Sequence, residues 1–565
     1  MGTSLDKLTI QGFKSIQELK DFELTNLNVI VGANGAGKSN LISFFRMLRS
    51  LIDGNLNRYV RDSGGAGDLL FNGRKQTESM YFKTRFGARG YRFTLVPTPS
   101  NKCAIEDEAR YYAGGHSGWW SLGDSDDGKS KMVAEVLDKT SDAKYSRPVF
   151  DAITSWQIYH FHDTSGTASM RHYEIVQDNK VLREDASNIA PFLLKLKNDF
   201  QADYKAILNA IRLVTPFFDD FILEPQKSGE KEEVNISWLQ KGSDYPMQPY
   251  HLSDGSIRFI CLATALLQPN PPSTIIIDEP ELGLHPAAIV ILGELIQQAA
   301  QRTQVIIATQ SPALIDQFAI DNIVVVNRKD GASTFERLNE KDFSEWLESY
   351  SVGELWTKNV IAGGPRYEQI FISATQVSKP GEKGGDVRFV KVERDLGNHL
   401  KQRANTYVTT LVDYYGVKEW PGLDSLGKNL QPAQIAAHLN QATQDKVNTL
   451  FPEQRPAERF IPFMLIHEFE ALLFSDSELL ASELNIDEKE VKAVLAECGE
   501  PEAINNSPQT APSKHLDKWS KYGKFAKTST GITIASNIGI PKMREKCPLF
   551  NDWLNTLEAL VKGPV

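Results

Sequence analysis

The chain has 565 residues, a formal net charge of −10 and 41% hydrophobic residues. This composition is typical of a globular protein and excludes a fibrous or wholly disordered chain. The length is enough for about three or four domains of roughly 150 residues each. The acidic charge argues against a generally basic nucleic-acid binder, although it does not exclude a local basic groove.

Cysteine usage and hydropathy indicate the compartment. The four cysteines have no CxxC spacing, which argues against a disulfide scaffold and a structural zinc site and is typical of a reducing cytosol. No run approaches the roughly 18 apolar residues of a membrane span, and the N-terminus has no signal-peptide pattern. We therefore expect a cytoplasmic protein that does not cross a membrane.

The first motif in chain order is a phosphate-binding loop. Residues 32–39 read GANGAGKS and match the pattern GxxxxGK[ST] in full. The apolar run at 27–31 predicts a strand before the loop, and residues 41–51 have the spacing of a helix after it. Loop glycines let backbone N–H groups turn toward a triphosphate, and the helix adds its positive end. The residues predicted to bind ATP are Asn34, Gly35, Gly37, Lys38 and Ser39.

Two of these residues have distinct predicted roles. The Lys38 ammonium reaches the β- and γ-phosphates, whereas the Ser39 hydroxyl coordinates Mg²⁺. The sequence therefore predicts ATP and Mg²⁺ as cofactors. A chance glycine-rich turn is the alternative, and the flanking strand and helix argue against it.

Residues from about 54 to 250 are predicted to form an insertion. Residues 54–145 are rich in Gly, Ser, Asp and aromatic residues and contain strand-like runs. Residues 185–215 have apolar side chains at helix spacing. We expect a β-rich part followed by a helical lid. Because the insertion lacks sustained heptads, we expect no long coiled-coil arm of the SMC or Rad50 type.

A second motif combines a buried strand with acidic residues. Residues 274–281 read TIIIDEPE, and residues 305–307 repeat the continuous apolar pattern of a central parallel strand. The first strand delivers Asp278 to its C-terminal end, where α/β sheets bind ligands. Asp278 is predicted to hold Mg²⁺, and Glu279 to act as the general base on the attacking water. The alternative is that both residues cap the next helix.

The combination of these motifs resembles a known family. Residues 252–256 read LSDGS, which alone indicates only a helix N-cap at Ser253. Together with the phosphate loop and the segments DEPELGLHP and IIATQSP, this segment resembles an ATPase with an ABC-type head. The resemblance covers residues 5–362 and is closest to bacterial AAA-family ATPases related to RecF and to the overcoming-lysogenisation-defect proteins. It implies an α/β fold, with an ABC-type P-loop ATPase head that carries the insertion.

The resemblance also implies an ATP-sandwich homodimer or a higher homo-oligomer. In ABC-type heads the signature serine and glycine of one protomer face the γ-phosphate bound by the other, and here these residues are Ser253 and Gly255. The chain departs from the family at LSDGS, where LSGGQ is usual, and at Gln310, where a switch histidine is usual. Gln310 can hydrogen-bond a γ-phosphate or a water but carries no proton charge, so we expect slow or gated hydrolysis. A solvated strand end is the alternative for Gln310.

The C-terminal part has a different character. The Gly-Gly-Pro sequence at 363–365 predicts a domain boundary, because Gly and Pro together end regular structure. We therefore expect an ATPase domain at 1–363 and a second α/β domain at 364–565. Residues 407–412 predict a strand, and Asp413 follows it, where α/β folds place metal-binding carboxylates.

Further candidate ligands follow later in the chain. His467, Glu468 and Glu470 cluster at a predicted strand-to-helix junction. With Asp413 they are candidate ligands of a divalent cation, or they bind phosphate together with Lys514. The alternatives are that Asp413 caps a turn and that His467 is a core histidine with its hydrogen bonds satisfied.

Segments 407–416, 460–474 and 504–514 together resemble a bacterial domain family of unknown function that is encoded beside such ATPases and is related to Toprim-type nucleases. The resemblance implies a Toprim-like α/β domain. The family usually begins with a strand that ends in EGxTE, and no such motif precedes Glu368 here. The missing glutamate favours a sensor or docking role, whereas the strand-end Asp413 favours a metal-dependent nuclease.

Three functions stay open. The first is a Mg²⁺-dependent ATPase whose ATP-bound dimer gates a C-terminal effector or sensor domain, by resemblance in antiviral defence, with a toxin or effector protein as a candidate partner. The second is an ATP-gated, metal-dependent nuclease acting on DNA or RNA. The third is a RecF-like DNA-repair clamp without nuclease activity. Arg171, Lys195 and Lys197 would contribute to that clamp, unless they form a solvated charged face.

Overall fold

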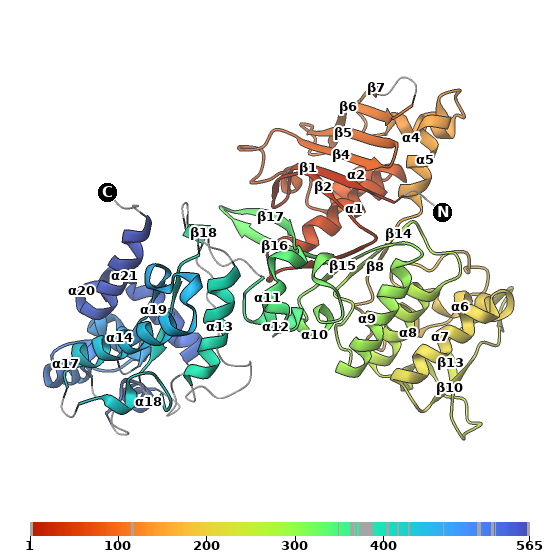
Figure 1. Cartoon of the computed structure of the whole chain (residues 1–565). Coiled ribbons are helices and arrows are strands. Elements are labelled where there is room, and N and C mark those ends of the chain that lie inside the picture. Colours follow the sequence, from red (N-terminus) through yellow and green to blue (C-terminus); the bar gives the residue numbers. More distant parts are fainter. Residues whose placement is uncertain are drawn as a thin grey trace. The chain divides into compact units, whose positions relative to one another are not determined.

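The chain forms two compact units, which are described separately (Figure 1). Unit 1 comprises Met1–Asp342 and Tyr350–Pro365, and unit 2 comprises Phe343–Ser349 and Arg366–Val565. Among the described residues, none of the helices is long and apolar enough to span a membrane. The computed structural model describes residues 4–114, 118–348, 350–361, 366–367, 370–371, 388–402, 406–414, 417–427, 430–466, 468–504, 510–520, 525 and 527–561.

A central, mostly parallel sheet organises unit 1. Its strand order is β17-β16-β3-β15-β14-β8, and every neighbouring pair is parallel except β16 and β17. The side chains of β3 and β15 are entirely buried, because continuous apolar runs suit strands that are covered on both faces. The predicted strands at 27–31, 275–277 and 305–307 are thereby confirmed. The bounds are β3 Leu27–Val31, β8 Gln157–Tyr159, β14 Thr274–Asp278, β15 Gln304–Thr309, β16 Ile323–Lys329 and β17 Ala332–Arg337.

The helices around this sheet follow their apolar spacing. The predicted helix at 41–51 is confirmed as the buried core of α1, and α8 buries every side chain from Ile257 to Leu267. Helices α1, α9 and α10 each follow a strand of the sheet, as in other α/β folds. The bounds in this layer are α1 Lys38–Ile52, α8 Asp254–Leu267, α9 Pro286–Ala300, α10 Pro312–Ile315 and α12 Val352–Thr357, with the short turns η3 Ile320–Asn322 and η4 Glu340–Asp342.

The predicted β-rich part is an antiparallel sheet with the order β2-β1-β4-β5-β6-β7. It begins with the first two strands of the chain, so the insertion extends an existing hairpin. Helices α4 and α5 pack against β5 and β6. The bounds are β1 Lys7–Phe13, β2 Ile16–Glu23, β4 Met80–Phe86, β5 Arg89–Pro97, β6 Cys103–Tyr112, β7 Gly118–Ser125, α2 Leu56–Asp62, α3 Ala66–Leu69, α4 Lys131–Leu137 and α5 Ala143–Thr154.

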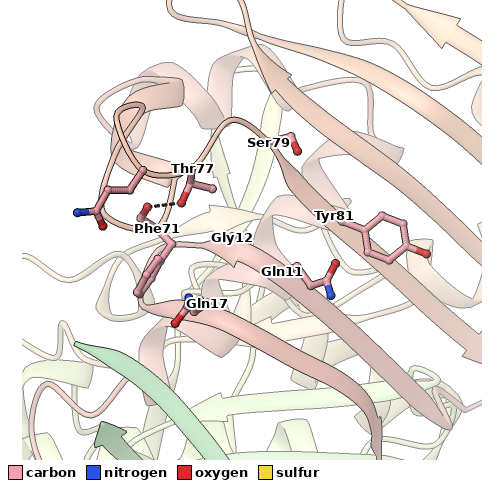
Figure 2. Close-up of a pocket in the computed structure, with 8 residues that line it drawn as sticks. Gln11, Gly12, Gln17, Phe71, Thr77, Ser79 and Tyr81 are labelled. Atoms are coloured by element: carbon pink, nitrogen blue, oxygen red, sulfur yellow. Dashed lines mark hydrogen bonds between the residues drawn. The ribbon is translucent and has the colours of Figure 1, made fainter. Parts of the chain in front are cut away.

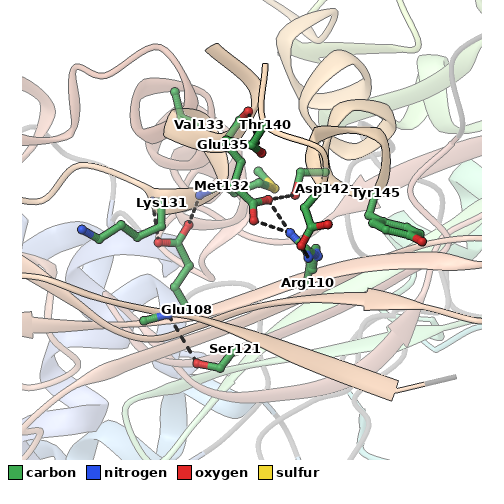
Figure 3. A network of polar contacts seen from close by, with 12 residues as sticks. Glu108, Arg110, Ser121, Lys131, Met132, Val133, Glu135, Thr140, Asp142 and Tyr145 are labelled. Carbon is green, nitrogen blue, oxygen red and sulfur yellow. Dashed lines mark hydrogen bonds and ion pairs between the residues drawn. The ribbon is translucent and has the colours of Figure 1, made fainter. Parts of the chain in front are cut away.

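A polar network fixes α4 and α5 to the sheet (Figure 3). The buried Glu108 carboxylate accepts hydrogen bonds from the backbone N–H groups of Lys131 (2.8 Å) and Met132 (3.1 Å) at the N-terminus of α4. Arg110 forms ion pairs with Glu135 and with Asp142, the latter at 2.8 Å. A carboxylate at a helix N-terminus satisfies N–H groups that have no partner inside the helix.

The predicted helical part at 185–215 forms two consecutive helices with small strands beside them. Helix α7 packs against α8. Between α1 and α8, the longest described helix is α7 with 14 residues, so the described insertion contains no coiled-coil arm. The bounds are α6 Ile189–Asp199, α7 Gln201–Val214, β9 Glu174–Ile175, β10 Phe218–Ile222, β11 Gln226–Ser228, β12 Lys231–Val234, β13 Ser237–Gln240, η1 Ser169–Arg171 and η2 Pro249–His251.

Unit 2 is mostly helical in its described part, with two short parallel strand pairs, β20 with β22 and β21 with β23. The prediction of one continuous strand at 407–412 is wrong, because the strand is interrupted at Thr410. The Thr410 hydroxyl oxygen accepts a hydrogen bond from the Phe463 N–H group at 3.0 Å, so a side chain replaces the main-chain ladder there. The strand bounds are β18 Arg366–Tyr367, β19 Ile370–Phe371, β20 Val408–Thr409, β21 Val412–Asp413, β22 Phe460–Ile461 and β23 Met464–Leu465.

The helices of unit 2 bury two apolar clusters, one around α13 and α14 and the other around α16 to α21. The helix bounds are α11 Ser344–Leu347, α13 Phe389–Gln402, α14 Pro432–Leu450, α15 Pro456–Arg459, α16 Ser477–Leu484, α17 Glu488–Cys498, α18 Pro512–Trp519, α19 Ile532–Ile538, α20 Ile540–Lys546 and α21 Pro548–Val561. Shorter turns are η5 Leu423–Ser425, η6 Pro452–Gln454, η7 Phe469–Ser475, η8 Pro501–Ala503 and the π-turn η9 Lys527–Gly531.

Candidate functional site

The phosphate loop connects β3 to α1 and is braced by the β16–β17 hairpin. Gly37 has φ of 117°, and a Cβ atom there would overlap Ser333 Oγ, so only glycine fits. The Ser333 hydroxyl donates to the carbonyl oxygen of Ala36 at 2.6 Å and lies 2.6 Å from the hydroxyl oxygen of Ser15. Asn40, in the first turn of α1, donates to the same Ser15 oxygen at 2.6 Å. The hairpin and the β1–β2 turn together hold the loop in shape.

The predicted nucleotide-binding residues lie together at this loop. Lys38 is buried, and its Nζ donates to the carbonyl oxygens of Gly32 (2.6 Å) and Ala33 (3.3 Å). Ser39 is exposed in the first turn of α1, and Asn34 and Gly35 are exposed in the loop. The exposed loop and the helix N-terminus are therefore accessible to a phosphate group.

The acidic motif faces Lys38. Burial lowers the pKa of the Lys38 ammonium, whereas the nearby carboxylates of Glu279, Asp278 and Glu281 raise it. Burial and the adjacent Glu279 raise the pKa of Asp278, and the positive charges of Arg46 and Lys38 counteract them. These mutual effects place the lysine and the carboxylates in one electrostatic environment.

Glu279 and Gln310 lie side by side at the ends of β14 and β15. Gln310 Nε2 donates to Glu279 Oε1 at 3.4 Å, and the Glu279 N–H group donates to the carbonyl oxygen of Ala308 at 2.8 Å. Glu279 has a positive φ of 45°, which is unusual for a residue with a side chain. Such backbone strain is typical of residues that a fold positions for function.

Glu281 is a site residue that the sequence reasoning did not single out. Its Oε1 accepts a hydrogen bond from the Thr309 hydroxyl at 2.6 Å, and its buried Oε2 has no hydrogen-bond partner among the described residues. Burial raises the pKa of this carboxyl group. The sequence feature that could have identified Glu281 is the second glutamate of DEPE, three positions after Asp278.

Two histidines complete the acidic edge and were also missed. His162 follows β8, the edge strand next to β14, and its Nε2 is hydrogen-bonded to the carbonyl oxygen of Asp278 at 3.1 Å. The ring of His160 lies 4.0 Å from that of His162 between centroids. Burial lowers the pKa of His160, as do the charges of His162 and Arg46. The parallel pairing of β8 with β14 brings both histidines next to the acidic motif. No local sequence pattern predicts this pairing.

The LSDGS segment starts α8. Ser253 caps the helix, since its Oγ accepts a hydrogen bond from the Ser256 N–H group at 3.1 Å. A Cβ atom on Gly255 would lie 2.6 Å from the carbonyl oxygen of Gly283, so the first turn of α8 packs closely on the loop after β14. In the described part of the chain, neither Ser253 nor Gly255 hydrogen-bonds to residues 32–39.

Two arginines fix this segment, and one of them corrects an expectation. Arg171 is buried, donates to the carbonyl oxygens of Pro249 and Leu252, and forms an ion pair with Asp254 at 2.9 Å. The RecF-like alternative expected Arg171 on a DNA-binding surface, but its burial and its partners exclude that role. Arg258 donates to the carbonyl oxygen of Phe161 at 2.8 Å and links α8 to the segment that carries the histidines.

Unit 2 gathers the acidic residues of its candidate site. Asp413 Oδ1 accepts a hydrogen bond from the Phe469 N–H group at 3.1 Å. The buried Glu468 carboxylate accepts bonds from the Ser513 N–H group (2.8 Å) and hydroxyl (2.9 Å). Burial and the nearby Glu470 raise the pKa of Asp413 to about 7, and the charge of Lys527 opposes this shift.

Lysine neutralises part of this acidic cluster. Lys527 Nζ forms an ion pair with the buried Glu470 at 2.5 Å, whereas the predicted Lys514 pairs with Asp517 at 4.0 Å. His467 lies outside the described residues. Among the described residues, no group of three or more His, Cys, Asp or Glu side chains has the arrangement of a metal site.

Comparison with solved structures finds partial likeness to SMC head domains. An SMC head bound to the C-winged helix domain of ScpA has a TM-score of 0.37 and 18% identity, over 60% of this chain and 98% of that chain. An SMC head with an extended coiled coil, bound to the C-terminal domain of ScpA derived from Pyrococcus furiosus, has a TM-score of 0.38 and 17% identity, over 61% and 98%. The SMC head domain from Thermotoga maritima has a TM-score of 0.30 and 15% identity, over 60% and 99%.

Comparison with protein families finds a match in each part of the chain. No curated protein matches it. Residues 353–558 match the "Domain of unknown function (DUF4276)". Residues 27–316 match the family described as "AAA domain, putative AbiEii toxin, Type IV TA system". Since this match spans more than half of the chain and includes the phosphate loop and the acidic motif, the chain belongs to that family of AAA domains and is an ATP-hydrolysing P-loop enzyme.

Proposed function

We propose that the protein is a Mg²⁺-dependent ATPase whose ATP-bound dimer gates the C-terminal unit, which acts as an effector or a sensor in a defence or toxin–antitoxin system. The observation that supports this most directly is that burial lowers the pKa of Lys38, whereas the carboxylates of Glu279 and Asp278 raise it. Lys38 belongs to a phosphate loop whose shape is held by Ser333. The family description supports the biological setting. The remaining roles follow from the chemistry of these side chains.

The oxygen donors at the site fit Mg²⁺ and ATP. Ser39 offers an exposed hydroxyl, and Asp278 offers a carboxylate at the end of β14, which are the donor types that Mg²⁺ prefers. When bound, Mg²⁺ would neutralise charge that develops on the phosphate oxygens. The exposed loop N–H groups and the Lys38 ammonium would bind the phosphates themselves.

Glu279 would act as the general base of hydrolysis. Its carboxylate accepts the proton of the attacking water, while the water oxygen bonds to the γ-phosphorus and the bond to the β–γ bridging oxygen breaks, which gives ADP and phosphate. The hydrogen bond from Gln310 Nε2 to Glu279 Oε1 holds the base in orientation. Since this amide cannot carry a proton, Gln310 orients the base and does not relay the proton.

The dimer proposal rests on the separation of the two halves of the site. Ser253 and Gly255 are held against the loop after β14, and no described hydrogen bond joins them to the phosphate loop of the same chain. Tyr250 and Leu282 beside them have exposed side chains, 69% and 46% accessible. We propose that a second copy covers these apolar side chains and contributes its phosphate loop opposite Ser253.

Complementation between two inactive variants tests this proposal. Lys38→Ala removes the phosphate ligand, and Ser253→Asp places a negative charge against the partner's γ-phosphate while it keeps the N-cap of α8. Each variant alone should be inactive, whereas co-expressed protomers form one intact site per mixed dimer and recover about a quarter of the wild-type rate. Ser253→Asn, which caps the helix without a charge, is the matched control and should stay active. A mixture as inactive as either variant would contradict the dimer.

A second candidate function, a metal-dependent nuclease in unit 2, has one specific observation in its favour. Glu470, Glu468 and Lys527 all influence the charge of Asp413 at the end of β21, although the carboxylates among the described residues do not have the arrangement of a metal site. A carboxylate with a pKa of about 7 can exchange a proton near neutral pH. We would measure the nicking of supercoiled plasmid and the cleavage of RNA, with ATP and Mg²⁺ or Mn²⁺. Cleavage that is lost in Asp413→Ala supports the nuclease, and an uncut substrate with intact ATPase activity supports a sensor.

A further inference from the structure

The outer face of the antiparallel sheet carries polar and aromatic side chains. Along β4, Phe82 and Phe86 are buried, whereas Tyr81, Lys83 and Arg85 point to the other side and are partly exposed. The buried side chains belong to one core cluster with residues of α1, α4 and α5. The inner face is therefore the core side, and within unit 1 the outer face carries these partly exposed side chains.

The strand register places like charges directly opposite each other on this outer face. Lys7 of β1 pairs with Arg85 of β4, and Lys83 of β4 pairs with Arg92 of β5. Like charges in directly opposed positions destabilise a sheet. A bound anion would remove this repulsion, so the arrangement favours a negatively charged ligand.

Three of these four cations have an acidic partner, and two further exposed acids, Glu18 and Glu106, lie on the same face in the row of Gln11 and Tyr81. Arg85 has no ion pair among the described residues, and its guanidinium stacks on Tyr111 instead. The acids of the other pairs are exposed, so solvent screens them and they can give way to a stronger anion. These pairs are Lys7 with Glu23 at 2.8 Å, Lys83 with Asp21 at 2.6 Å and Arg92 with Asp107 at 3.3 Å.

Two aromatic rings on β6 and β7 border the cations of β1, β4 and β5. The Arg85 guanidinium lies 3.5 Å from the ring centroid of Tyr111, and that of Arg92 lies 5.0 Å from the ring of Trp119. Tyr111 and Trp119 are opposite each other in the β6–β7 register, with ring centroids 5.3 Å apart. We call the surface formed by the following residues the Arg–aromatic face: Lys7, Lys83, Arg85, Arg92, Tyr111 and Trp119.

A polar cavity lies at the end of this sheet that leads to the β1–β2 turn (Figure 2). Its volume is about 300 Å³, and Gln11 and Tyr81, which line it, face each other across β1 and β4. Gln17 and Gln76 also line it. Amide side chains offer both donors and acceptors, as the edge of an unpaired base requires.

We propose that the Arg–aromatic face binds single-stranded nucleic acid. The cations would contact successive phosphates, and Tyr111, Trp119 and the arginine planes would stack with unpaired bases. Aromatic rings beside the cations favour this ligand over a duplex, whose bases are already stacked, and over an acidic protein, which has no bases. The cavity would receive one base at the end of the strand. The net charge of −10 does not oppose this, because the binding field is local.

The test measures binding of labelled single-stranded oligonucleotides of uridine or thymidine, about 20 nucleotides long, by fluorescence anisotropy at low salt. We expect the full chain to bind, and Arg85→Ala/Arg92→Ala to bind at least about tenfold more weakly. The matched control is Arg58→Ala/Arg61→Ala on α2, which removes two arginines with 75% exposed side chains from another layer. This control should bind within about twofold of the wild type. Equal losses in both variants would overturn the proposal.

Further variants separate binding at this face from binding elsewhere on the chain. Trp119→Ala should weaken binding about fivefold or more through lost stacking. Lys38→Ala should bind the oligonucleotide normally, because the face is separate from the phosphate loop. Preference for the uridine or the thymidine oligonucleotide shows whether RNA or DNA of this kind is favoured. No binding, binding unaffected by Trp119→Ala, or equal binding of a duplex or of polyglutamate would each overturn the proposal. Unchanged thermal unfolding of each variant shows that it is folded.

Discussion

Both units place a lysine beside carboxylates at the ends of parallel strands, but they balance the charges differently. In unit 1, Lys38 Nζ donates to loop carbonyl oxygens, and no ion pair joins it to a carboxylate within the described residues. In unit 2, Lys527 pairs directly with Glu470 at 2.5 Å. The site of unit 1 therefore keeps its cation and its acids apart for a ligand to bridge, whereas the cluster of unit 2 neutralises part of its own charge.

The scaffolds under the two clusters differ as well. In unit 1, β3, β14 and β15 have five or six residues each and are almost entirely buried. In unit 2, each strand of the two parallel pairs has two residues. Side chains on long buried strands are held more precisely than side chains on short, interrupted ones. The strands of unit 1 therefore support phosphate chemistry there better than the strands of unit 2 support any chemistry.

The largest expected effect comes from Lys38→Ala, which removes the only cation of the phosphate loop sequence, residues 32–39. We expect the affinity for ATP to fall by about a hundredfold or more, because several charge-assisted hydrogen bonds are lost together. Isothermal titration calorimetry measures this affinity for ATP. Lys20→Ala, which changes an exposed lysine of β2, is the matched control and should bind ATP normally. Tight ATP binding by Lys38→Ala would contradict the assignment of the loop.

The next effect concerns the chemical step. Glu279→Gln should lower the rate of hydrolysis by about 10² to 10⁴, because the amide cannot accept the proton of water, while ATP binding persists. The ATP-bound dimer should accumulate, which light scattering and a phosphate-release assay detect together. The exposed Glu294 of α9, changed to Gln, is the control. Hydrolysis at the wild-type rate would show that Glu279 is not the base.

The sequence was sufficient for the parts of the site that depend on local patterns. A glycine-rich loop and continuous apolar runs predicted β3, α1, β14 and β15. Such runs indicate buried strands, and the loop motif lies between a strand and a helix. His162 and Arg258 were missed. They reach the site through the pairing of β8 with β14 and through side-chain bonds to distant carbonyl oxygens.

In unit 2 the local pattern was misleading. Residues 407–412 have the composition of one strand, but Thr410 is buried and its hydroxyl oxygen takes the place of a ladder acceptor. The sequence also contained no sign of the ion pair between Glu470 and Lys527, because Lys527 comes from a segment more than fifty positions away. Side-chain competition and long-range pairing therefore limit what a pattern can predict.

A smaller effect tests the charge balance of unit 2. Asp413 has a pKa of about 7 in the folded chain, above its ordinary 3.8. Between about pH 4 and about pH 7 the folded state holds a proton that the unfolded chain releases, so the free energy of unfolding falls as the pH rises, by up to about 4 kcal/mol. Asp413→Asn should remove this dependence in thermal melts, and the exposed Asp424→Asn should keep it. An identical pH profile for wild type and Asp413→Asn would contradict the burial of a protonated Asp413.

The smallest effect concerns the contacts between Ser333 of the β16–β17 hairpin and the phosphate loop. Ser333→Ala removes the hydrogen bond to the carbonyl oxygen of Ala36 and the contact with Ser15, so we expect a loss of about 1 kcal/mol of stability and a few-fold weaker ATP binding. Thr334→Ala, at the next position of β17, is the control and should bind ATP normally. Arg328 still donates to the carbonyl oxygen of Gly35 at 3.4 Å, which limits the loss. Unchanged affinity in Ser333→Ala would mean that the glycine loop holds its shape without the hairpin.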